Sequence, residues 1–218
     1  GSCEAPLRRG FVLFAATLAA MSIAHRIRVQ QVETRSDHFN RVLNTTLDWQ
    51  RADGRWQRLQ RETVDHGDGA AILLYHLQQR TVVLVRQLRY ACVINGLDEL
   101  LVEVPAGLLD AASPEDCIRA EAEQEVGFHV RQPRRVFDAF MSPGSLTERV
   151  HCFVAEYDPA DRIGHGGGLE HEGEDIEVLE LPFDDALAMV ADGRIRDAKT
   201  IMLLQHAALQ LFAAPVHE

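Results

Sequence analysis

Two glutamates one helical turn apart are the residues of this sequence best placed to do chemistry. Glu121 and Glu125 are four positions apart in a stretch that predicts a helix, so their side chains share one face. Like charges at this spacing repel by roughly a few tenths of a kcal/mol, and a divalent cation would compensate. Carboxylate oxygens suit magnesium, with manganese as the alternative. Taken alone, the same spacing also occurs on solvated helix faces.

The segments around this pair predict a strand, a loop and a helix. Residues 100–104 predict a strand, which Pro105 and Gly107 end. Ser113 as helix cap and Pro114 in the first turn predict a helix from about residue 115 to 126. Gly127 closes this helix because glycine readily adopts a positive φ.

The strand, the loop Pro105-Ala-Gly107, the helix and Gly127 together resemble the Nudix box. In that family the box reads Gly, five residues, Glu, seven residues, Arg-Glu, an aliphatic, any residue, Glu-Glu, any residue, Gly, an aliphatic. Counting back from Gly127, Glu121 and Glu125 fall on the two positions that most directly hold metal. The backbone carbonyl of Ala106 also matches a family metal ligand. The resemblance therefore implies a metal-dependent Nudix hydrolase.

This stretch departs from the family pattern at several positions. The segment after Gly107 is one residue short, and Ser113 or Ala112 stands where the first Glu belongs. Ala120 replaces the Arg, and Gln124 replaces the first Glu of the pair, so it can hydrogen bond but carries no charge. We expect weaker metal binding than in a full box, and the rate could fall with it.

The resemblance extends from about Met21 to Phe212 and is closest to the GDP-mannose and ADP-ribose pyrophosphatases. The markers are Leu84-Val-Arg-Gln-Leu-Arg-Tyr90, Val102-Glu-Val-Pro-Ala-Gly-Leu-Leu-Asp110, Met141-Ser-Pro-Gly-Ser-Leu-Thr-Glu148 and Gly166-Gly-Gly-Leu-Glu-His-Glu-Gly-Glu-Asp-Ile-Glu-Val178. In this branch a late-loop Glu completes the metal site or positions the attacking water, and the matching residues are Glu174 and, as the second choice, Glu172. The resemblance implies a nucleoside diphosphate sugar as substrate rather than a nucleoside triphosphate.

Three further side chains are candidates for binding this substrate. The guanidinium groups of Arg86 and Arg89 suit phosphate oxygens, although both could be ordinary surface cations at a strand end. Glu148 is either a substrate contact, as the family suggests, or a charge at a strand entry. The glycine-rich stretch 164–168 lacks the Gly-Lys-Ser/Thr of a P-loop, and we expect a mobile lid there.

The implied reaction needs a metal, a water and a cation. Glu121, Glu125 and Glu174 would hold one or more magnesium ions, which lower the pKa of a bound water. Glu174 or Glu172 would orient that water. Arg86 or Arg89 would neutralise charge on the phosphoryl oxygens as a nucleoside monophosphate and a sugar phosphate are released.

Composition restricts the partners of the chain. It has 218 residues, and its 33 Asp and Glu against 22 Lys and Arg give a formal net charge of -11. No basic run could neutralise a polyphosphate backbone, so we expect no nucleic acid partner. An acidic protein needs local cations or bound metal to hold an anionic substrate.

The patterning predicts an α+β protein with the Nudix fold: a mixed β-sheet core sandwiched between helices, plus an N-terminal antiparallel β subdomain. The expected domains are 21–66 for the β subdomain and 67–218 for the hydrolase. Strands are expected at 26–29, 45–49, 56–64, 70–75, 81–85, 136–140, 150–157 and 176–181, and helices at 184–191 and 200–212. Relatives pair through their N-terminal strands, so we expect a homodimer.

Residues 1–20 are expected to be a leader or an extension. Arg8 and Arg9 precede an apolar run at residues 11–20, which could be a signal peptide, an upstream translation or an added helix. The run is too short to span a bilayer, so we expect no membrane association through it. The cysteines, Cys3, Cys92, Cys117 and Cys152, are scattered, which favours reduced thiols in a cytoplasmic protein.

Two other functions compete with the hydrolase. The departures from the box are compatible with a Nudix-fold binding module that senses a nucleotide sugar and has lost its chemistry. A scaffold with an unused cleft is the third interpretation, and the joint presence of Glu121, Glu125 and Glu174 disfavours it.

Overall fold

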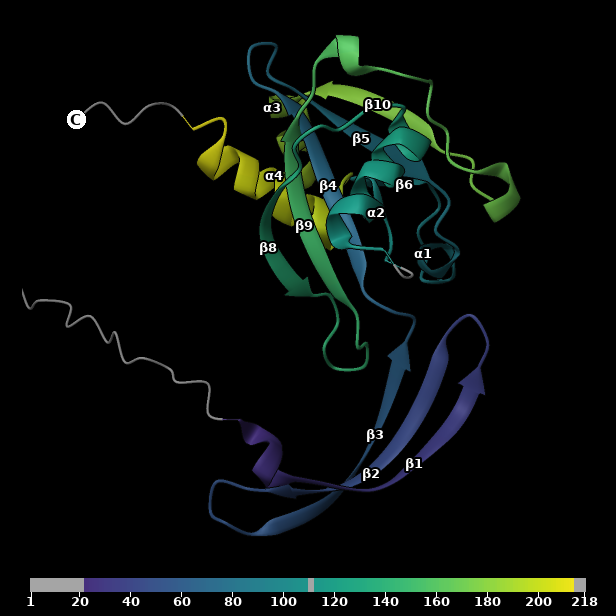
Figure 1. Cartoon of the computed structure of the whole chain (residues 1–218), viewed down its shortest axis with the longest axis vertical. Coiled ribbons are helices and arrows are strands. Elements are labelled where there is room, and N and C mark those ends of the chain that lie inside the picture. The colour runs from purple at the N-terminus through teal and green to yellow at the C-terminus, as the bar shows by residue number, and fades with distance from the viewer. Residues whose placement is uncertain (1–21, 110–111, 214–218) are drawn as a thin grey trace, which may run out of the picture. The chain divides into compact units, whose positions relative to one another are not determined.

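The computed structural model of the chain describes residues 22–109 and 112–213, and it divides into two compact units (Figure 1). One unit contains residues 22–33 and 44–61, and the other contains residues 34–43 and 62–213. The predicted leader at 1–20 lies outside the described residues. No helix of the described part is long and apolar enough to cross a bilayer.

The N-terminal strands form a three-stranded sheet in the order β1-β2-β3, which confirms the predicted antiparallel element. After the short 3-10 helix η1 (Ile23–Arg26), the strands are β1 (Ile27–Asp37), β2 (Arg41–Gln50) and β3 (Trp56–Asp65). Cation–π contacts stiffen this sheet, because Arg26 lies 4.3 Å from the centre of the Trp49 ring and Arg28 lies 3.8 Å from that of Trp56.

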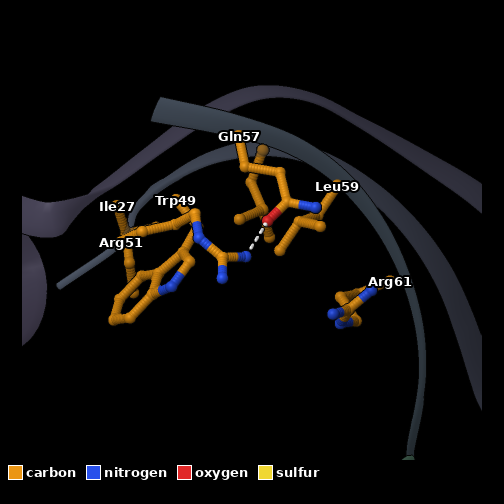
Figure 2. Close-up of a pocket in the computed structure, with 7 residues that line it drawn as sticks. Ile27, Trp49, Arg51, Gln57, Leu59 and Arg61 are labelled. Carbon is orange, nitrogen blue, oxygen red and sulfur yellow. Dashed lines mark hydrogen bonds between the residues drawn. The ribbon is translucent and has the colours of Figure 1, made fainter. Parts of the chain in front are cut away.

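The first unit also carries a hollow of about 450 Å³ (Figure 2). The Arg51 guanidinium reaches across it to donate to the Gln57 side-chain oxygen at 2.8 Å. Apolar and cationic side chains mix in its lining, which comprises Ile27, Leu47, Trp49, Arg51, Gln57, Leu59 and Arg61.

The larger unit is built on a seven-stranded mixed sheet whose main path runs β10-β5-β4-β9-β8. Its strands are β4 (Gly69–His76), β5 (Thr81–Gln87), β6 (Leu101–Glu103), β7 (Ala106–Leu108), β8 (Arg134–Phe140), β9 (Arg149–Glu156) and β10 (Glu177–Pro182). The central pair β4 and β9 is parallel, and the other pairs are antiparallel. The predicted hairpin is confirmed as β4 and β5, joined by a turn at residues 77–80.

Strands β4 and β5 pair only near the turn that joins them and then diverge. Residues 74–76 of β4 pair with β5, while its residues 69–71 pair with β7. The other half of β5, residues 85–87, pairs with β6. The chain therefore crosses from β5 to β4 as it passes from β6 to β7. At the crossing, the Ile72 amide donates to the Pro105 carbonyl at 3.0 Å. This crossing places Ala106 in the middle of the sheet.

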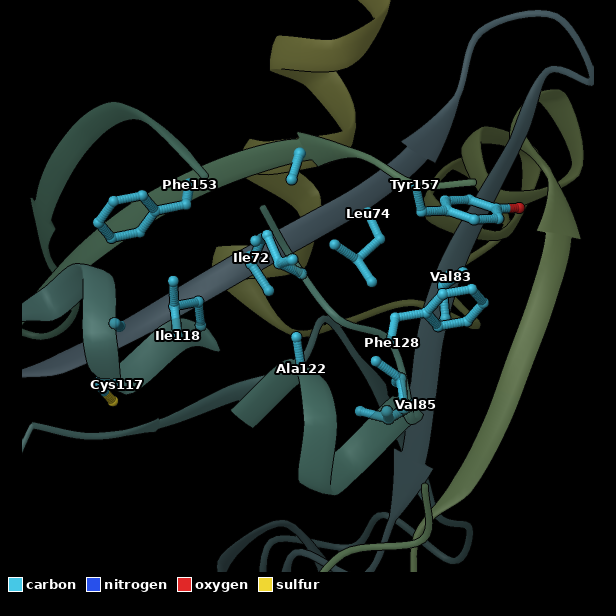
Figure 3. Close-up of a cluster of buried hydrophobic side chains, with 14 of the residues drawn as sticks. Ile72, Leu74, Val83, Val85, Cys117, Ile118, Ala122, Phe128, Phe153 and Tyr157 are labelled. Carbon is cyan, nitrogen blue, oxygen red and sulfur yellow. The ribbon is translucent and has the colours of Figure 1, made fainter. Parts of the chain in front are cut away.

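Helices cover both faces of this sheet, which confirms the predicted layers (Figure 1). The residues of β4 alternate, with Ile72 and Leu74 in one core and Ala71 and Leu73 in the other. Helix α2 (Pro114–Glu121) covers the first core, and Figure 3 shows its Ile118 and the following Ala122 pointing toward Ile72. Helices α3 (Phe183–Ala191) and α4 (Ala198–Gln210) cover the second core.

Several short elements were not predicted. They are the 3-10 helix η1, which includes residue 26 of the first expected strand, α1 (Tyr90–Ile94), the three-residue strand β7, and the 3-10 turns η3 (Pro159–Asp161) and η4 (Glu170–Glu172). The expected helix over 115–126 is α-helical only to Glu121 and continues as a π-helix, η2 (Ala122–Val126). A wider π turn carries no distinct hydrophobic period, so the sequence pattern could not separate it from the α-helix.

Candidate metal and phosphate site

The helix that presents the glutamate pair has well-defined ends. Ser113 caps α2 by accepting a hydrogen bond from the Asp116 amide at 3.2 Å, and Pro114 occupies the first turn. At the other end Gly127 has a φ of 73°, as predicted for the closing glycine. The π turn follows Glu121, contains Glu125 and ends at the closing glycine, and such turns are common at functional sites.

Glu125 is a buried and strongly perturbed carboxylate of this site. Its side chain is 1% exposed, and its Oε2 accepts a hydrogen bond from the Ala106 amide at 3.1 Å. Burial is the main cause that raises the pKa of Glu125 to about 8; the charges of Glu121 and Glu174 add to the rise, while the Ala106 amide and Arg89 oppose it. The chain therefore holds a buried acid that prefers to be neutral unless positive charge is added beside it.

Glu121 lies in the space left by the missing side chain of Gly107. A Cβ atom at position 107 would lie 1.8 Å from the Glu121 Oε1 atom. Gly107 follows Ala106 in β7, so both glutamates contact the same short strand. The structure thus brings Glu121, Glu125 and Ala106 together at β7.

The pairing of β7 directs the polar atoms of Ala106 toward the glutamates. In an antiparallel pair, every second residue of a strand bonds to its neighbour. Here those residues include Pro105, which accepts from the Ile72 amide, and Leu109, which donates to the Asp68 carbonyl. Ala106 lies between them, so its amide and carbonyl both face away from β4. Because the amide reaches Glu125, the carbonyl oxygen lies on the side of the glutamate pair.

Glu174 lies close enough for its charge to affect Glu125, but its carboxylate is engaged in its own loop. The Leu169 amide donates to Glu174 Oε2 at 2.8 Å, and Gly168, with a φ of 78°, makes room for that oxygen. Glu172 is exposed in η4, where its nearest ionic neighbour is His171 at 3.7 Å. Of the two late-loop candidates, Glu174 is the one whose charge is among the main causes of the raised pKa of Glu125.

The glycine-rich stretch 164–168 is anchored to the helix rather than free as the expected mobile lid. The amides of Gly167 and Gly168 donate to the carbonyls of Glu125 and Gln124 at 3.0 and 3.1 Å. A Cβ atom at Gly166 would lie 2.3 Å from the Glu125 carbonyl oxygen. The loop therefore satisfies carbonyl groups that the end of the helix leaves unpaired, which ties the loop bearing Glu174 to the helix bearing Glu125.

The two candidate arginines have different surroundings. Arg89 donates from Nε to Glu103 Oε1 at 2.6 Å, and its charge acts on Glu125. Arg86 is paired with Glu177, which lies directly opposite it on β10. Of the two arginines, Arg89 is the one whose charge is among the main influences on the pKa of Glu125.

The third substrate candidate lies near the start of β4. A Cβ atom at Gly69 would lie 3.6 Å from Glu148 Oε1. The structure therefore places the Glu148 carboxylate beside the first residue of β4.

Sequence reasoning missed a buried ion network next to Arg89. Glu103, which is 1% exposed, binds Lys199 Nζ at 2.5 Å as well as Arg89. Lys199 also pairs with Asp197 at 2.8 Å, and burial alone would lower the pKa of Lys199, but Glu103 and Asp197 raise it above its usual value. Lys199 is the only lysine in the sequence, and this was the one signal that could have drawn attention to it.

The donors at the glutamate pair suit a hard cation. Among residues 22–109 and 112–213, no three His, Cys, Asp or Glu side chains converge as a complete metal-binding cluster. Two carboxylates and an outward-facing carbonyl are nevertheless oxygen ligands of the type that magnesium and manganese prefer. The raised pKa of Glu125 shows that added positive charge would stabilise its ionised form, so the residues fit a divalent ion.

Comparison with known proteins places these residues in context. Residues 26–63 match the family described as the GDP-mannose pyrophosphatase NudK N-terminal domain. The chain is 52% identical over 176 residues to a GDP-mannose pyrophosphatase of Pectobacterium atrosepticum, covering 80% of this chain and 90% of the relative. It is also 52% identical to the GDP-mannose pyrophosphatase of Klebsiella pneumoniae, over 78% of this chain and 86% of the relative. The identity to the enzyme of that name from Escherichia coli is 49%, over 78% of this chain and 89% of the relative.

Proposed function

Because the chain belongs to the GDP-mannose pyrophosphatases, a family of Nudix hydrolases, we propose that it hydrolyses the pyrophosphate bond of a nucleoside diphosphate sugar, with GDP-mannose as the first substrate to test. The products would be a nucleoside monophosphate and a sugar phosphate. The single observation that best supports this proposal is the buried Glu125, whose pKa is raised to about 8 beside Glu121 and Ala106. A carboxylate held in this way is costly unless it binds a cation.

The metal of this reaction is proposed to be magnesium, with manganese as a substitute. Glu121, Glu125 and the Ala106 carbonyl would hold it, and Glu174 would join after leaving the Leu169 amide. When bound, a divalent ion of this kind supplies positive charge to the phosphates and lowers the pKa of a coordinated water.

The remaining roles are assigned to side chains near the pair. Glu174 is also proposed to orient the attacking water, because it lies near enough for its charge to act on Glu125; Glu172 is the second choice. Arg89 is proposed to bind a phosphoryl oxygen and to stabilise the negative charge that grows on it. Arg86 and Glu148 are kept as outer substrate contacts.

Product analysis tests the proposed reaction. GDP-mannose, ADP-ribose and UDP-glucose are each incubated with the protein and magnesium, and nucleoside monophosphate and sugar phosphate are quantified. We expect release from at least one of them, and loss of release with EDTA. Release of no monophosphate from any of the three would contradict the proposed activity.

The two arginines provide a matched pair for the phosphate site. Arg89→Ala is expected to lower kcat/KM by about 100-fold, because a charge that stabilises the transition state is lost. Arg86→Ala removes an outer contact and a surface ion pair with Glu177, so it should lower kcat/KM by less than about threefold. A loss of less than about threefold from Arg89→Ala would remove Arg89 from its proposed role.

The chain is also proposed to form a homodimer through its N-terminal sheet. Strand β1 is exposed along most of its length, and Val29 and Val32 are 59% and 53% exposed. A three-stranded sheet with apolar residues on an open strand gains stability from a second copy. Sedimentation velocity should give a dimer that Val32→Asp weakens, whereas a wild-type monomer at micromolar concentration would contradict this proposal.

A further inference from the structure

Glu103 lies at the centre of a buried network that joins the proposed phosphate site to a helix. It is the last residue of β6, three positions before Ala106. Its two oxygens receive different cations: Oε1 accepts from Arg89 Nε at 2.6 Å, and Oε2 accepts from Lys199 Nζ at 2.5 Å and, more weakly, from Arg89 Nη2 at 3.4 Å. One carboxylate thus fixes two cations that come from distant parts of the chain.

The other end of this network is anchored in the first turn of α4. Asp197 caps the helix by accepting from the Thr200 amide at 2.9 Å, and it also accepts from Lys199. The Thr200 hydroxyl donates to Asp197 at 2.6 Å and accepts from the Val104 amide at 2.8 Å, directly after Glu103. Every member is hydrogen bonded, so the network is rigid in a part of the protein where unpaired charge would be costly.

Arg89 is the member of the network whose charge is a main influence on the pKa of Glu125. Its contacts with Glu103 use the Nε and Nη2 atoms, which lie along one edge of the guanidinium group. The remaining nitrogen, Nη1, is not used by Glu103. A planar guanidinium held along one edge keeps a fixed direction for the donors that remain.

We propose that Glu103 is a positioning residue, which holds the Arg89 guanidinium in the direction needed to bind a phosphoryl oxygen of the substrate and braces it through Lys199 against α4. This inference rests on the proposed hydrolase function and on Arg89 as its phosphate cation. Lys199 donates to the second oxygen of Glu103 at 2.5 Å, where the contact from Arg89 Nη2 is longer, at 3.4 Å. Loss of the Glu103 charge therefore releases Arg89 without removing it.

A double-mutant cycle tests this role with the full-length protein, GDP-mannose and magnesium. Glu103→Gln should lower kcat/KM by about 10-fold to 100-fold, since a shift of about 1 Å in a positioning group has an effect of this size. In an Arg89→Ala background the same change should have less than about a twofold effect, because the group that it positions is already gone. Affinity for GDP, which reports phosphate binding without turnover, should follow the same pattern by calorimetry.

Matched variants separate positioning from a general structural effect. Glu99→Gln removes the exposed carboxylate that pairs with Arg196 at 3.7 Å, just before the same strand and helix, and should leave kcat/KM and GDP affinity unchanged. Glu103→Asp keeps the charge but is one carbon shorter, so it should remain folded and still lose at least about fivefold in kcat/KM. This second variant decides the question if Glu103→Gln does not fold.

Three results would overturn the inference. The first is an equal loss from Glu103→Gln with and without Arg89, which would make Glu103 a purely structural link between β6 and α4. The second is full activity of Glu103→Asp. The third is a wild-type protein that releases no product from GDP-mannose or the other nucleotide sugars, in which case the hydrolase proposal fails as well. If the wild type is active but the effects of Glu103→Gln and Arg89→Ala simply add in the double mutant, only the role of Glu103 is refuted.

Discussion

Replacing Glu125 by Gln should make the metal-free protein more stable while it removes most of the activity. The Gln side chain keeps a carbonyl oxygen that can accept the Ala106 hydrogen bond, which is 3.1 Å long in the native chain. It removes the charge that burial and Glu121 oppose. Stability should rise while activity falls, so the two effects can be measured separately.

The size of the stability effect depends on pH. The pKa of Glu125 is about 8 in the folded chain and 4.5 for an isolated glutamate side chain, so the folded state holds a proton that the unfolded state releases between these values. Stability therefore falls as the pH rises through this window. A displacement of this size corresponds to roughly 5 kcal/mol against the ionised form above pH 8, and to almost nothing below pH 4.5.

Denaturant unfolding in EDTA from about pH 4.5 to about pH 9 measures this effect. We expect the wild type to lose stability across the range, and Glu125→Gln to be more stable than the wild type by about 2 to 5 kcal/mol at the upper end. Magnesium should restore the wild type and not the variant, and kcat should fall by about 100-fold to 1,000-fold. The exposed Glu62, changed to Gln, is the control and should follow the wild type. Parallel pH profiles for Glu125→Gln and the wild type would refute the reasoning.

Substitutions of glycine give two further predictions with internal controls. Gly107→Ala places a Cβ 1.8 Å from the Glu121 Oε1 atom, so it should displace that carboxylate. We expect the magnesium concentration for half-maximal activity to rise by about 10-fold, with little change in Tm. The control Gly144→Ala, whose Cβ meets nothing within 4 Å, should change neither quantity. Gly166→Ala and Gly173→Ala both put a side chain at a positive φ, of 70° and 79°, which costs about 1 kcal/mol each. Only Gly166→Ala also collides with a backbone carbonyl, at 2.3 Å, so it should lose at least about 2 kcal/mol more than Gly173→Ala in urea unfolding; equal losses would show that the loop is not packed on the helix end.

The sequence predicted the elements with clear chemical or periodic signals. Ser113, Pro114 and Gly127 marked the two ends of the helical segment, and the structure uses all three as caps or closing residues. The buried strands of the larger sheet were found because they are short apolar runs bounded by turns. Their bounds differ from the prediction by one or two residues, which reflects frayed strand ends.

Elements that depend on tertiary contacts could not be predicted in the same way. Strand β7 has three residues and exists because β4 and β5 diverge and leave Ala106 a place to pair. The short helix α1 has no side-chain cap and no buried residue, so it has neither start signal nor period. The anchoring of the glycine-rich loop depends on backbone atoms, which carry no sequence signature.

In the site too, some residues carry a sequence signal and others are selected only by tertiary contacts. Glu121 and Glu125 were identified because their spacing and the closing glycine carry a family pattern, and the structure brings both to β7. Which of Arg86 and Arg89 interacts with Glu125 could not be decided from sequence, because both lie within three residues of each other at the end of β5. The choice is made by β10, whose Glu177 pairs with Arg86, and by β6, whose Glu103 holds Arg89.

The departures from the Nudix box lie on the exposed side of the helix. Ser113, Ala120 and Gln124 are all exposed, whereas Glu125 is buried and Glu121 packs against β7. A binding module that used no metal would gain stability by losing the buried Glu125 charge, and such a gain is accessible by a single substitution. The chain instead keeps the costly inner pair beside an outward carbonyl, while its outer positions have lost charge. This asymmetry favours a working metal site over a sensor, and it predicts that the weakened outer positions change the affinity for magnesium more than the chemical step.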